Sequence, residues 1–395
     1  MKKHLLLSAL TGVVLILLSQ NAFAQGCVAI RPMSGCTGIS AGSAALNRGQ
    51  WQVGANYRYF RSFRHFRGDS EQKERLEQNT EVINLAHSVD LGLSYGITRR
   101  LSVSANLPYL HYDRSSLYEH YGNTPAANPE HKRFHTGSQG IGDLRLSGMY
   151  WLFDPEKQQK YNVAVGLGVK LPTGNENVQD EFHRRKSSDG SDSIVVKAVD
   201  QSIQLGDGGV GISFEVQAFT TVFKNGALYF NGFYLSNPQE TNKTVNRAIT
   251  PTTTDIQKIT AFHSIADQYV ARLGLNYTLL PSQGLAVNLG VRAEGIPAKD
   301  IIGKDGGFRR PGYIVSAEPG VSYQHGSVVF SFNVPYALYR NRVKSVSDLA
   351  DPTGQAHGDA AFADYSINFG AAWRFGGQHH AAAMENVPQF KKVTD

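Results

Sequence analysis

Residues 140–173 constrain the fold most, because side-chain character alternates along both arms of this stretch. The arms, 140–152 and 161–173, are separated by the polar run DPEKQQK. Apolar residues alternate with small or polar ones, and a period of two is the mark of a β-strand. Each arm is about 11 to 13 residues long, whereas typical strands have about 5 to 6. Long strands with one apolar and one polar face are typical of transmembrane β-barrels.

The same pattern repeats along most of the chain. The other segments predicted as strands are 50–60, 83–97, 101–111, 209–223, 227–236, 268–280, 285–296, 313–324, 327–339 and 362–375. With the two arms they make about twelve strands, and bacterial single-chain barrels have an even number. The predicted fold class is therefore all-β: a transmembrane antiparallel up-and-down β-barrel of the outer-membrane type.

The segments between these strands alternate in length. Short connections are expected near 98–100, 153–160, 224–226, 281–284 and 325–326, and long ones near 61–82, 112–139, 174–208, 237–267, 297–312 and 340–361. Outer-membrane barrels have short periplasmic turns and long extracellular loops, so both termini are expected in the periplasm. A soluble β-sandwich is the alternative, but it predicts neither the strand length nor this alternation.

The chain ends are expected to lie outside the barrel, which should span 50–375. Residues 1–24 combine a basic start, a short apolar run and an Ala-Phe-Ala site, which predicts a secretory signal peptide. Residues 25–49 read as an N-terminal periplasmic or plug segment closed by a Cys27–Cys36 disulfide, as expected in an exported protein. Lipid attachment at Cys27 is the alternative. Residues 376–395 lose the alternation and are expected to form a flexible periplasmic tail.

Charged residues on the inner strand faces are the candidate lumen-lining residues. They are Arg58, Asp90, Asp143, Arg145, Lys170, Glu215, Arg272, Arg292, Glu294, Glu318, Asp364 and Arg374. They would either fill the lumen as ion pairs or form a charged constriction that filters a polar solute. In one hairpin register Asp143 stands opposite Lys170. About twelve strands should leave a narrow channel, which residues 25–49 or the 174–208 loop could occlude.

Enzyme and nucleic-acid signatures are absent from the sequence. We find no nucleophile elbow, zinc-protease motif, Walker loop or EF-hand, and we predict no catalytic, cofactor or metal residues. The formal net charge of +6 includes no basic block, which argues against nucleic-acid binding. His87 and His111 should lie opposite each other on the lipid face. His131 and His135 are four residues apart, a spacing that suits a metal only on a helix.

Three motifs resemble one outer-membrane family, named for the meta-pathway of phenol degradation. They are Gly142-Asp143-Leu144, Val169-Lys170-Leu171-Pro172-Thr173-Gly174 and Gly96-Ile97-Thr98 with Asn106-Leu107-Pro108-Tyr109. The similarity is clearest over 83–175 and extends towards Phe375. It implies a non-enzymatic barrel in the outer membrane of a Gram-negative bacterium.

Such a barrel would take up small solutes, among them aromatic or hydrophobic compounds. Its expected partners are outer-membrane lipid, the solute and the barrel assembly machinery, to which the last strand would present Phe375. Two alternatives stay open. One is an outer-membrane enzyme such as a lipase or protease, which would depend on His87 or His111. The other is a surface scaffold or adhesin that binds a partner through its long loops.

Overall fold

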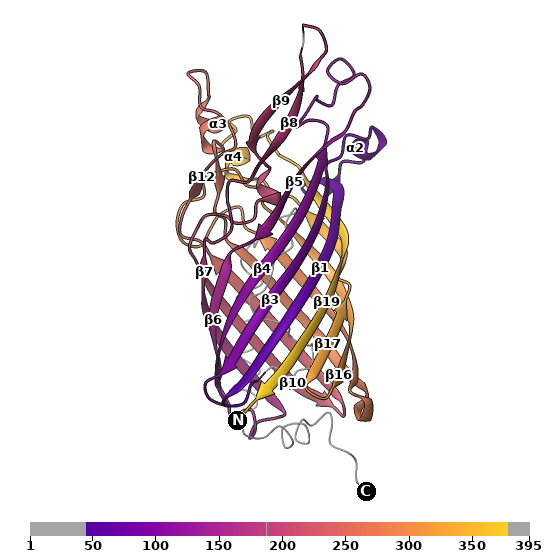
Figure 1. Cartoon of the computed structure of the whole chain (residues 1–395), viewed down its shortest axis with the longest axis vertical. Helices are drawn as coiled ribbons and strands as arrows, with labels where there is room; N and C mark the ends of the chain where they lie inside the picture. Colours follow the sequence, from indigo (N-terminus) through magenta and orange to yellow (C-terminus); the bar gives the residue numbers. More distant parts are fainter. Residues whose placement is uncertain (1–44, 187, 378–395) are drawn as a thin grey trace.

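The chain folds into a closed antiparallel β-barrel of twelve strands, as predicted. The computed structural model describes residues 45–186 and 188–377. The barrel closes because β1 (Gln50–Arg67) pairs with β19 (Ala360–Gly376), from Gln50 opposite Gly376 to Phe66 opposite Ala360. Figure 1 shows long connections gathered at one end of the barrel and short turns at the other. We call these the loop end and the turn end.

The strands follow one another around the barrel in chain order. Between β1 and β19 these are β3 (Ile83–Gly96), β4 (Leu101–Ser116), β5 (Phe134–Ile141) with β6 (Leu144–Trp151), β7 (Tyr161–Leu171), β10 (Gly211–Phe223), β11 (Gly226–Ser236), β14 (Gln268–Leu280), β15 (Leu285–Ile296), β16 (Gly312–His325) and β17 (Val328–Asn333) with β18 (Tyr336–Asn341). Two of the twelve are interrupted. β5 and β6 are separated by Gly142 and Asp143, and β17 and β18 by Val334 and Pro335.

Exposure alternates along the strands as the sequence pattern requires. In β7, Val165, Leu167 and Val169 are 43%, 61% and 39% exposed, whereas Ala164 and Lys170 between and beside them are 0% and 1% exposed. The exposed side chains form an apolar outer wall, and the buried ones point inward. The barrel is therefore apolar outside and largely polar inside, which is the arrangement that suits lipid on one side and water on the other.

The long connections contain more structure than predicted. β5 lies mostly within the predicted 112–139 connection. The additional elements are β2 (Ser70–Glu71), α2 (Glu74–Glu77), β8 (Gln179–Arg185), β9 (Asp192–Ala198), η1 (Gln201–Ile203), β12 (Thr241–Val245), α3 (Asp255–Ile259), β13 (Phe262–Ser264), η2 (Pro281–Gln283) in a short turn, and α4 (Val346–Leu349). Within the described ranges, no helix has both the length and the apolar character needed to cross a membrane.

The register of the central hairpin differs from the one that pairs Asp143 with Lys170. Lys170 is paired with Arg145, and Leu171 with Leu144. Asp143 lies just beyond the paired region, because the strand is interrupted there. The signal peptide, Cys27 with Cys36, residues 25–44 and residues 378–395 lie outside the described residues, so these predictions stay as predictions.

Candidate functional site

Residues 199–207, which we call the inner segment, lie within the loop end of the barrel between β9 and β10. Three of its side chains, Val199, Ile203 and Leu205, are between 0% and 7% exposed. They form one buried cluster with inward-facing residues of β1, β3 and β4: Phe60, Ala86, Leu110 and Tyr112. The 174–208 connection therefore enters the lumen. This agrees with one of the two predicted ways in which the channel could be occluded.

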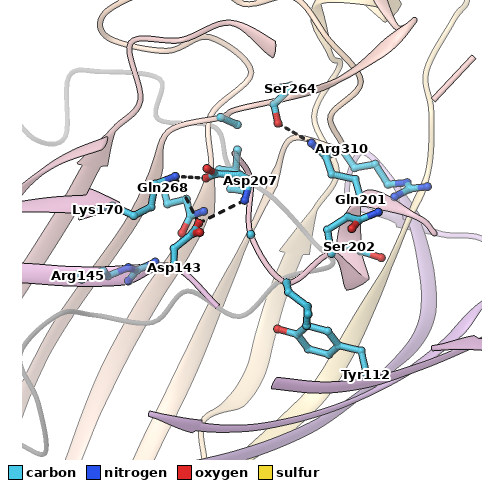
Figure 2. Close-up of a pocket in the computed structure, with 15 residues that line it drawn as sticks. Tyr112, Asp143, Arg145, Lys170, Gln201, Ser202, Asp207, Ser264, Gln268 and Arg310 are labelled. Atoms are coloured by element: carbon cyan, nitrogen blue, oxygen red, sulfur yellow. Dashed lines mark hydrogen bonds and ion pairs between the residues drawn. The ribbon is translucent and has the colours of Figure 1, made fainter. Parts of the chain in front are cut away.

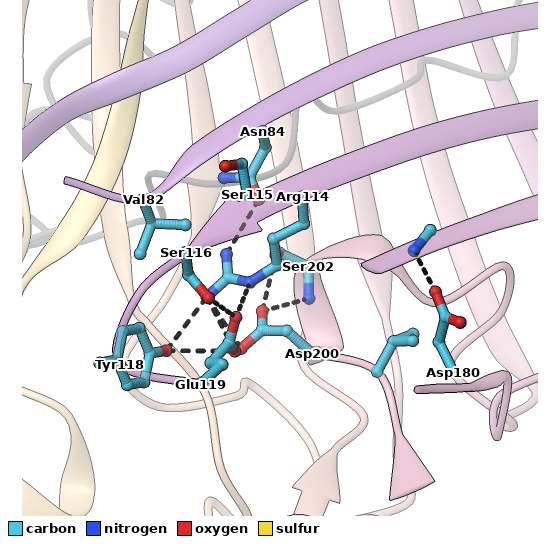
Figure 3. Close-up of polar contacts among 12 residues, drawn as sticks. Val82, Asn84, Arg114, Ser115, Ser116, Tyr118, Glu119, Asp180, Asp200 and Ser202 are labelled. Carbon is cyan, nitrogen blue, oxygen red and sulfur yellow. Dashed lines mark hydrogen bonds and ion pairs between the residues drawn. The ribbon is translucent and has the colours of Figure 1, made fainter. Parts of the chain in front are cut away.

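Asp200 holds the first end of the inner segment (Figure 3). Its carboxylate caps η1 by accepting hydrogen bonds from the Ser202 backbone N–H at 3.0 Å and from the Ser202 hydroxyl at 2.6 Å. The same carboxylate forms ion pairs with Arg310 at 2.6 Å and with Arg114 of β4 at 3.5 Å. Burial acts to raise the pKa of Asp200, but the guanidinium groups of Arg114 and Arg310 hold it well below its usual range.

Lys170 and Asp143 hold the other end, as Figure 2 shows. Lys170 is 1% exposed and forms an ion pair with Asp207. Its ammonium also lies 3.9 Å from the Asp143 carboxylate. Asp143 accepts hydrogen bonds from the backbone N–H of Gly174 at 3.0 Å and of Asp207 at 3.3 Å. The interruption between β5 and β6 thus places a carboxylate where it binds the inner segment.

Two glycines allow the inner segment to approach the wall closely. A Cβ added to Gly206 would lie 2.6 Å from both the Asp143 carboxylate and the Gly174 carbonyl oxygen. A Cβ added to Gly174 would lie 2.7 Å from the Leu205 carbonyl oxygen. Real Cβ atoms do not approach other atoms this closely, so glycine is required on both sides of the contact.

A cavity of about 90 Å³ lies between the inner segment and the surrounding wall. The inner segment contributes 201, 202 and 204–207 to its lining. The wall contributes charged side chains on β6 and β7, Arg145 and Lys170, and polar and apolar ones on β14 and β15, Gln268 and Ile296. Ser264 and Arg310 close it from the neighbouring connections. We call the narrow part of the lumen formed by the inner segment the constriction. The cavity is the candidate site at which a solute would pass it.

Nine of the twelve candidate lumen residues are buried, with less than a tenth of their surface exposed. They are Arg58, Asp143, Arg145, Lys170, Glu215, Arg272, Arg292, Glu294 and Glu318. The remaining three, Asp90, Asp364 and Arg374, are half-buried. The constriction brings together Asp143, Arg145 and Lys170, whereas most of the others lie elsewhere on the inner wall.

Four of the buried residues form an ion-pair cluster on β14, β15 and β16. Arg272 binds Glu318 through two hydrogen bonds of 2.8 Å, and Arg292 lies 2.8 Å from Glu294 and 3.8 Å from Glu318. Here the charges are matched within the wall, as expected if the inward-facing charges fill the lumen as ion pairs. None of the four lines the cavity.

Three of the other candidates lie where β1 pairs with β19 to close the barrel, Glu215 lies near the cavity, and Asp90 lies on β3 opposite Asn56 of β1. Arg58 donates to Asn368 at 2.8 Å, and Arg374 donates to Gln52 at 2.7 Å. Asp364 accepts ion pairs from Arg64 at 2.7 Å and Arg340 at 2.6 Å. Glu215 interacts electrostatically with Arg145.

Sequence reasoning missed the residues that fix and line the constriction: Arg114, Asp200, Gln201, Gln204, Asp207, Ser264, Gln268 and Arg310. Most of them lie outside alternating segments, so no strand period marks them. The one available signal was the glycine-rich run that begins at Gly206. Its first glycine is needed for the close contact with Asp143 and Gly174.

The predicted pairing of His87 with His111 is confirmed by the strand register. Their rings are 6.1 Å apart, His87 interacts with the Tyr57 hydroxyl at 2.8 Å, and His111 interacts with Gln139 at 3.3 Å. Among the described residues, neither histidine has a serine partner. His135 lies on β5 and His131 in the preceding connection, so the helix that a metal would need is not formed there.

Comparison with known proteins supports the resemblance seen in the sequence. The model of the family described as "Putative MetA-pathway of phenol degradation" matches residues 68–183. No curated protein matches the chain.

Several solved barrels are similar in structure at low sequence identity. The Pseudomonas putida toluene transporter TodX is 10% identical, with 87% of this chain and 94% of that chain covered and a TM-score of 0.39. The CymD monoaromatic hydrocarbon channel is 12% identical, with 92% and 100% covered and a TM-score of 0.41. The translocator domain of the autotransporter NalP from Neisseria meningitidis is 10% identical, with 84% and 90% covered and a TM-score of 0.41. The predicted resemblance to the phenol meta-pathway family is confirmed by the family match, over residues 68–183.

Proposed function

We propose that this protein is an outer-membrane channel that takes up small solutes through the lumen, past the inner segment. The observation that carries the proposal is the cavity of about 90 Å³ that lies beside the inner segment inside a closed barrel with a polar interior. A barrel of about twelve strands is wider than the side-chain-filled barrels of about eight strands. Its constriction is therefore formed by a folded-in connection.

The arrangement of the connections supports an orientation with both termini in the periplasm. Short turns lie at the end where β1 begins and β19 ends, and outer-membrane barrels place such turns in the periplasm. The apolar outer wall would contact outer-membrane lipid, and the last strand would be presented to the assembly machinery. The match to a family described by phenol degradation favours small aromatic compounds among the solutes.

Conductance of the purified, folded barrel in planar bilayers tests the proposal, together with swelling of liposomes in small neutral solutes. Replacing 200–206 by a Gly-Ser linker should raise conductance, because it removes the constriction. The same replacement at the exposed turn 249–253 is the matched control and should leave conductance unchanged. A folded barrel that shows neither conductance nor swelling with any solute would overturn the proposal.

A further inference from the structure

The hairpin of β8 and β9 is a two-stranded sheet separate from the barrel wall, and it rises beyond the loop end (Figure 1). The backbone N–H of Lys186 donates to the Ser191 carbonyl across the hairpin. Because hydrogen-bonded pairs alternate in an antiparallel sheet, the odd-numbered residues of β9 direct their backbone groups towards β8. The backbone groups of the even-numbered residues, including Ile194 and Val196, therefore point away from β8.

The two edges of this sheet differ in their cover. On the outer side of β8, the His183 backbone N–H donates to the His120 ring at 3.1 Å. Among the described residues, the backbone groups that β9 directs outwards have no hydrogen-bond partner. The sheet of β12 and β13 is different, because Phe308 covers its edge by accepting from the Ser264 N–H at 3.1 Å and donating to the Phe262 carbonyl at 2.7 Å. An uncovered edge is a template for pairing with another strand.

The side chains along this edge are apolar. Ile194, Val195 and Val196 are 52%, 46% and 60% exposed. Proteins usually protect exposed edges with proline, bulges or lysine. β9 contains no proline, and it pairs with β8 without a register shift. Its one lysine, Lys197, lies 4.2 Å from the centre of the Phe182 ring of the same hairpin, so its ammonium covers β8. The edge is therefore open to a strand with apolar side chains.

β9 is complementary to a second copy of itself. In an antiparallel pair, residues that direct their backbone groups outwards must lie opposite one another, so even-numbered positions face even-numbered positions. Full overlap of two copies of 192–198 gives apolar pairs at the centre and no pair of like charges. The opposite pairs are Val195 with Val195, Ile194 with Val196, Ser193 with Lys197, and Asp192 with Ala198.

The direction of the hairpin determines where the second copy lies. In Figure 1 the two strands rise from the loop end roughly along the barrel axis. The two-fold axis that relates antiparallel neighbours is perpendicular to their sheet, so here it is roughly perpendicular to the barrel axis. The two barrels then direct their loop ends at each other. Copies in one membrane have parallel barrel axes, so this pairing requires two facing membranes.

We propose that β9 is a homotypic adhesion strand, which pairs with β9 of a copy in a facing membrane and forms one four-stranded sheet. The loop end is accessible to such a copy in the orientation proposed above. Adhesion is a function separate from transport, because no residue of β9 lines the cavity beside the inner segment.

Docking of proteoliposomes tests adhesion. The full-length protein is reconstituted into two vesicle populations that carry a fluorescence donor and an acceptor. Because many weak contacts act together between vesicles, energy transfer should be at least about fivefold higher than between protein-free vesicles. Vesicles with protein should not dock to vesicles without it. Docking to protein-free vesicles would assign the exposed edge to lipid binding and would overturn the proposal.

Two charge-matched variants test the role of β9. Ile194→Lys/Val196→Lys places lysines opposite lysines, so docking should fall to the level of protein-free vesicles. Ile301→Lys/Ile302→Lys changes another exposed apolar pair, 72% and 55% exposed, and should dock as wild type. Folding of each variant is checked by its gel shift on heating. Unchanged docking of the folded β9 variant would overturn the proposal.

Disulfide trapping in docked vesicles tests the register, in a Cys27→Ser/Cys36→Ser background. Val195→Cys should give a linked dimer on oxidation, because Cα atoms of such a pair are about 4.5 Å apart, within the range for a disulfide. Ser193→Cys and Lys197→Cys should each give none alone, since each lies about 13 Å from its own copy. A mixture of these two variants should be linked. Equal linkage at all three positions would show random collision and overturn the pairing.

Adhesion and transport fail in different ways. Ile194→Lys/Val196→Lys should conduct as wild type in planar bilayers. A protein that docks vesicles through β9 but never conducts retains adhesion and loses the proposed transport. A protein that conducts while its wild-type vesicles do not dock retains transport and loses adhesion.

Discussion

Arg310 and Asp200 form a two-point ion pair, in which Nη1 donates to Oδ1 at 2.8 Å and Nη2 donates to Oδ2 at 2.6 Å. Arg310 lies in the connection before β16, whereas Asp200 begins the inner segment. The pair therefore joins the inner segment to one side of the rim, and Arg114 joins the same carboxylate to another side.

Substituting Asp200 should release the first end of the inner segment. Asp200→Asn removes the charge that compensates Arg310, whereas Arg114 keeps its ion pair with Glu119 at 2.8 Å. Breaking a buried pair such as Arg310 with Asp200 costs about 3–5 kcal/mol. Single-channel recordings should show a conductance at least about twofold higher, with more frequent current fluctuations. Asp255→Asn is the matched control, because its carboxylate is 97% exposed and pairs with Lys258 on the surface of α3. Equal currents in wild type and Asp200→Asn would contradict this role.

Substituting Lys170 should release the other end. Lys170→Met leaves Asp143 and Asp207 close together without their shared cation, so we expect a loss of about 3 kcal/mol in unfolding free energy. Conductance should rise and the current should become more cation-selective, as measured by reversal potentials in a salt gradient. The double variant Lys170→Met/Asp207→Asn should recover part of both changes, because it removes one of the two facing carboxylates. No recovery would show that the repulsion is not the cause.

Packing of the β8–β9 hairpin should depend on pH through His120. Burial between Phe134 and Phe182 lowers the pKa of His120 to about 4, against 6.5 for the free side chain. The folded state disfavours the protonated form, so stability is fully present above about pH 6.5 and falls as pH drops towards 4. The loss is about 3 kcal/mol at most.

Hydrogen exchange across β8 and β9 measures this effect. Protection should decrease between pH 6.5 and 4 in the wild type, after correction for intrinsic exchange. His120→Phe should remove most of the dependence by keeping an uncharged ring in the stack. His325→Gln, at an exposed position at the turn end, is the control and should behave as wild type. A pH dependence that persists in His120→Phe would assign it to other groups.

The ion-pair cluster on β14, β15 and β16 should affect stability without affecting conductance. Glu318 is 0% exposed, so Glu318→Gln leaves Arg272 buried without its carboxylate partner and should cost about 3–5 kcal/mol. Arg272→Met/Glu318→Leu should cost less, because it removes both charges. Unfolding in urea gives the free energies, and bilayer recordings give the conductance. A rise in conductance like that of Asp200→Asn would place this cluster in the solute path.

The barrel was predictable because its physical cause is local and repeated. Val165, Leu167 and Val169 must face lipid while Ala164 and Lys170 face inward, and this requirement is written into the sequence with a period of two. The lengths of the connections gave independent support. The register that places Asp143 opposite Lys170 was wrong, because Lys170 is opposite Arg145, yet the Lys170 ammonium still lies 3.9 Å from the Asp143 carboxylate.

The constriction could not be predicted in the same way. Asp200 and Arg310 are separated by 110 positions, and neither lies in an alternating segment. Val199, Ile203 and Leu205 are apolar residues in a connection, and their burial depends on an inner wall that forms only when the barrel closes. The sequence shows that the inward-facing charges are balanced. Only the three-dimensional structure shows which of them form the ion-pair cluster in the wall and which bind the inner segment.

The attachment of the inner segment at both ends links permeability to the mechanics of the rim. Asp200 connects β4 to the connection before β16, and Lys170 with Asp143 connects β6 and β7 to the same nine residues. These contacts join separate parts of the loop end to one another through the inner segment. A substitution that releases one end of the inner segment to widen the passage also removes a contact between separate parts of the loop end. Higher conductance gained in this way is therefore accompanied by a less rigid loop end, unless new contacts form elsewhere around it.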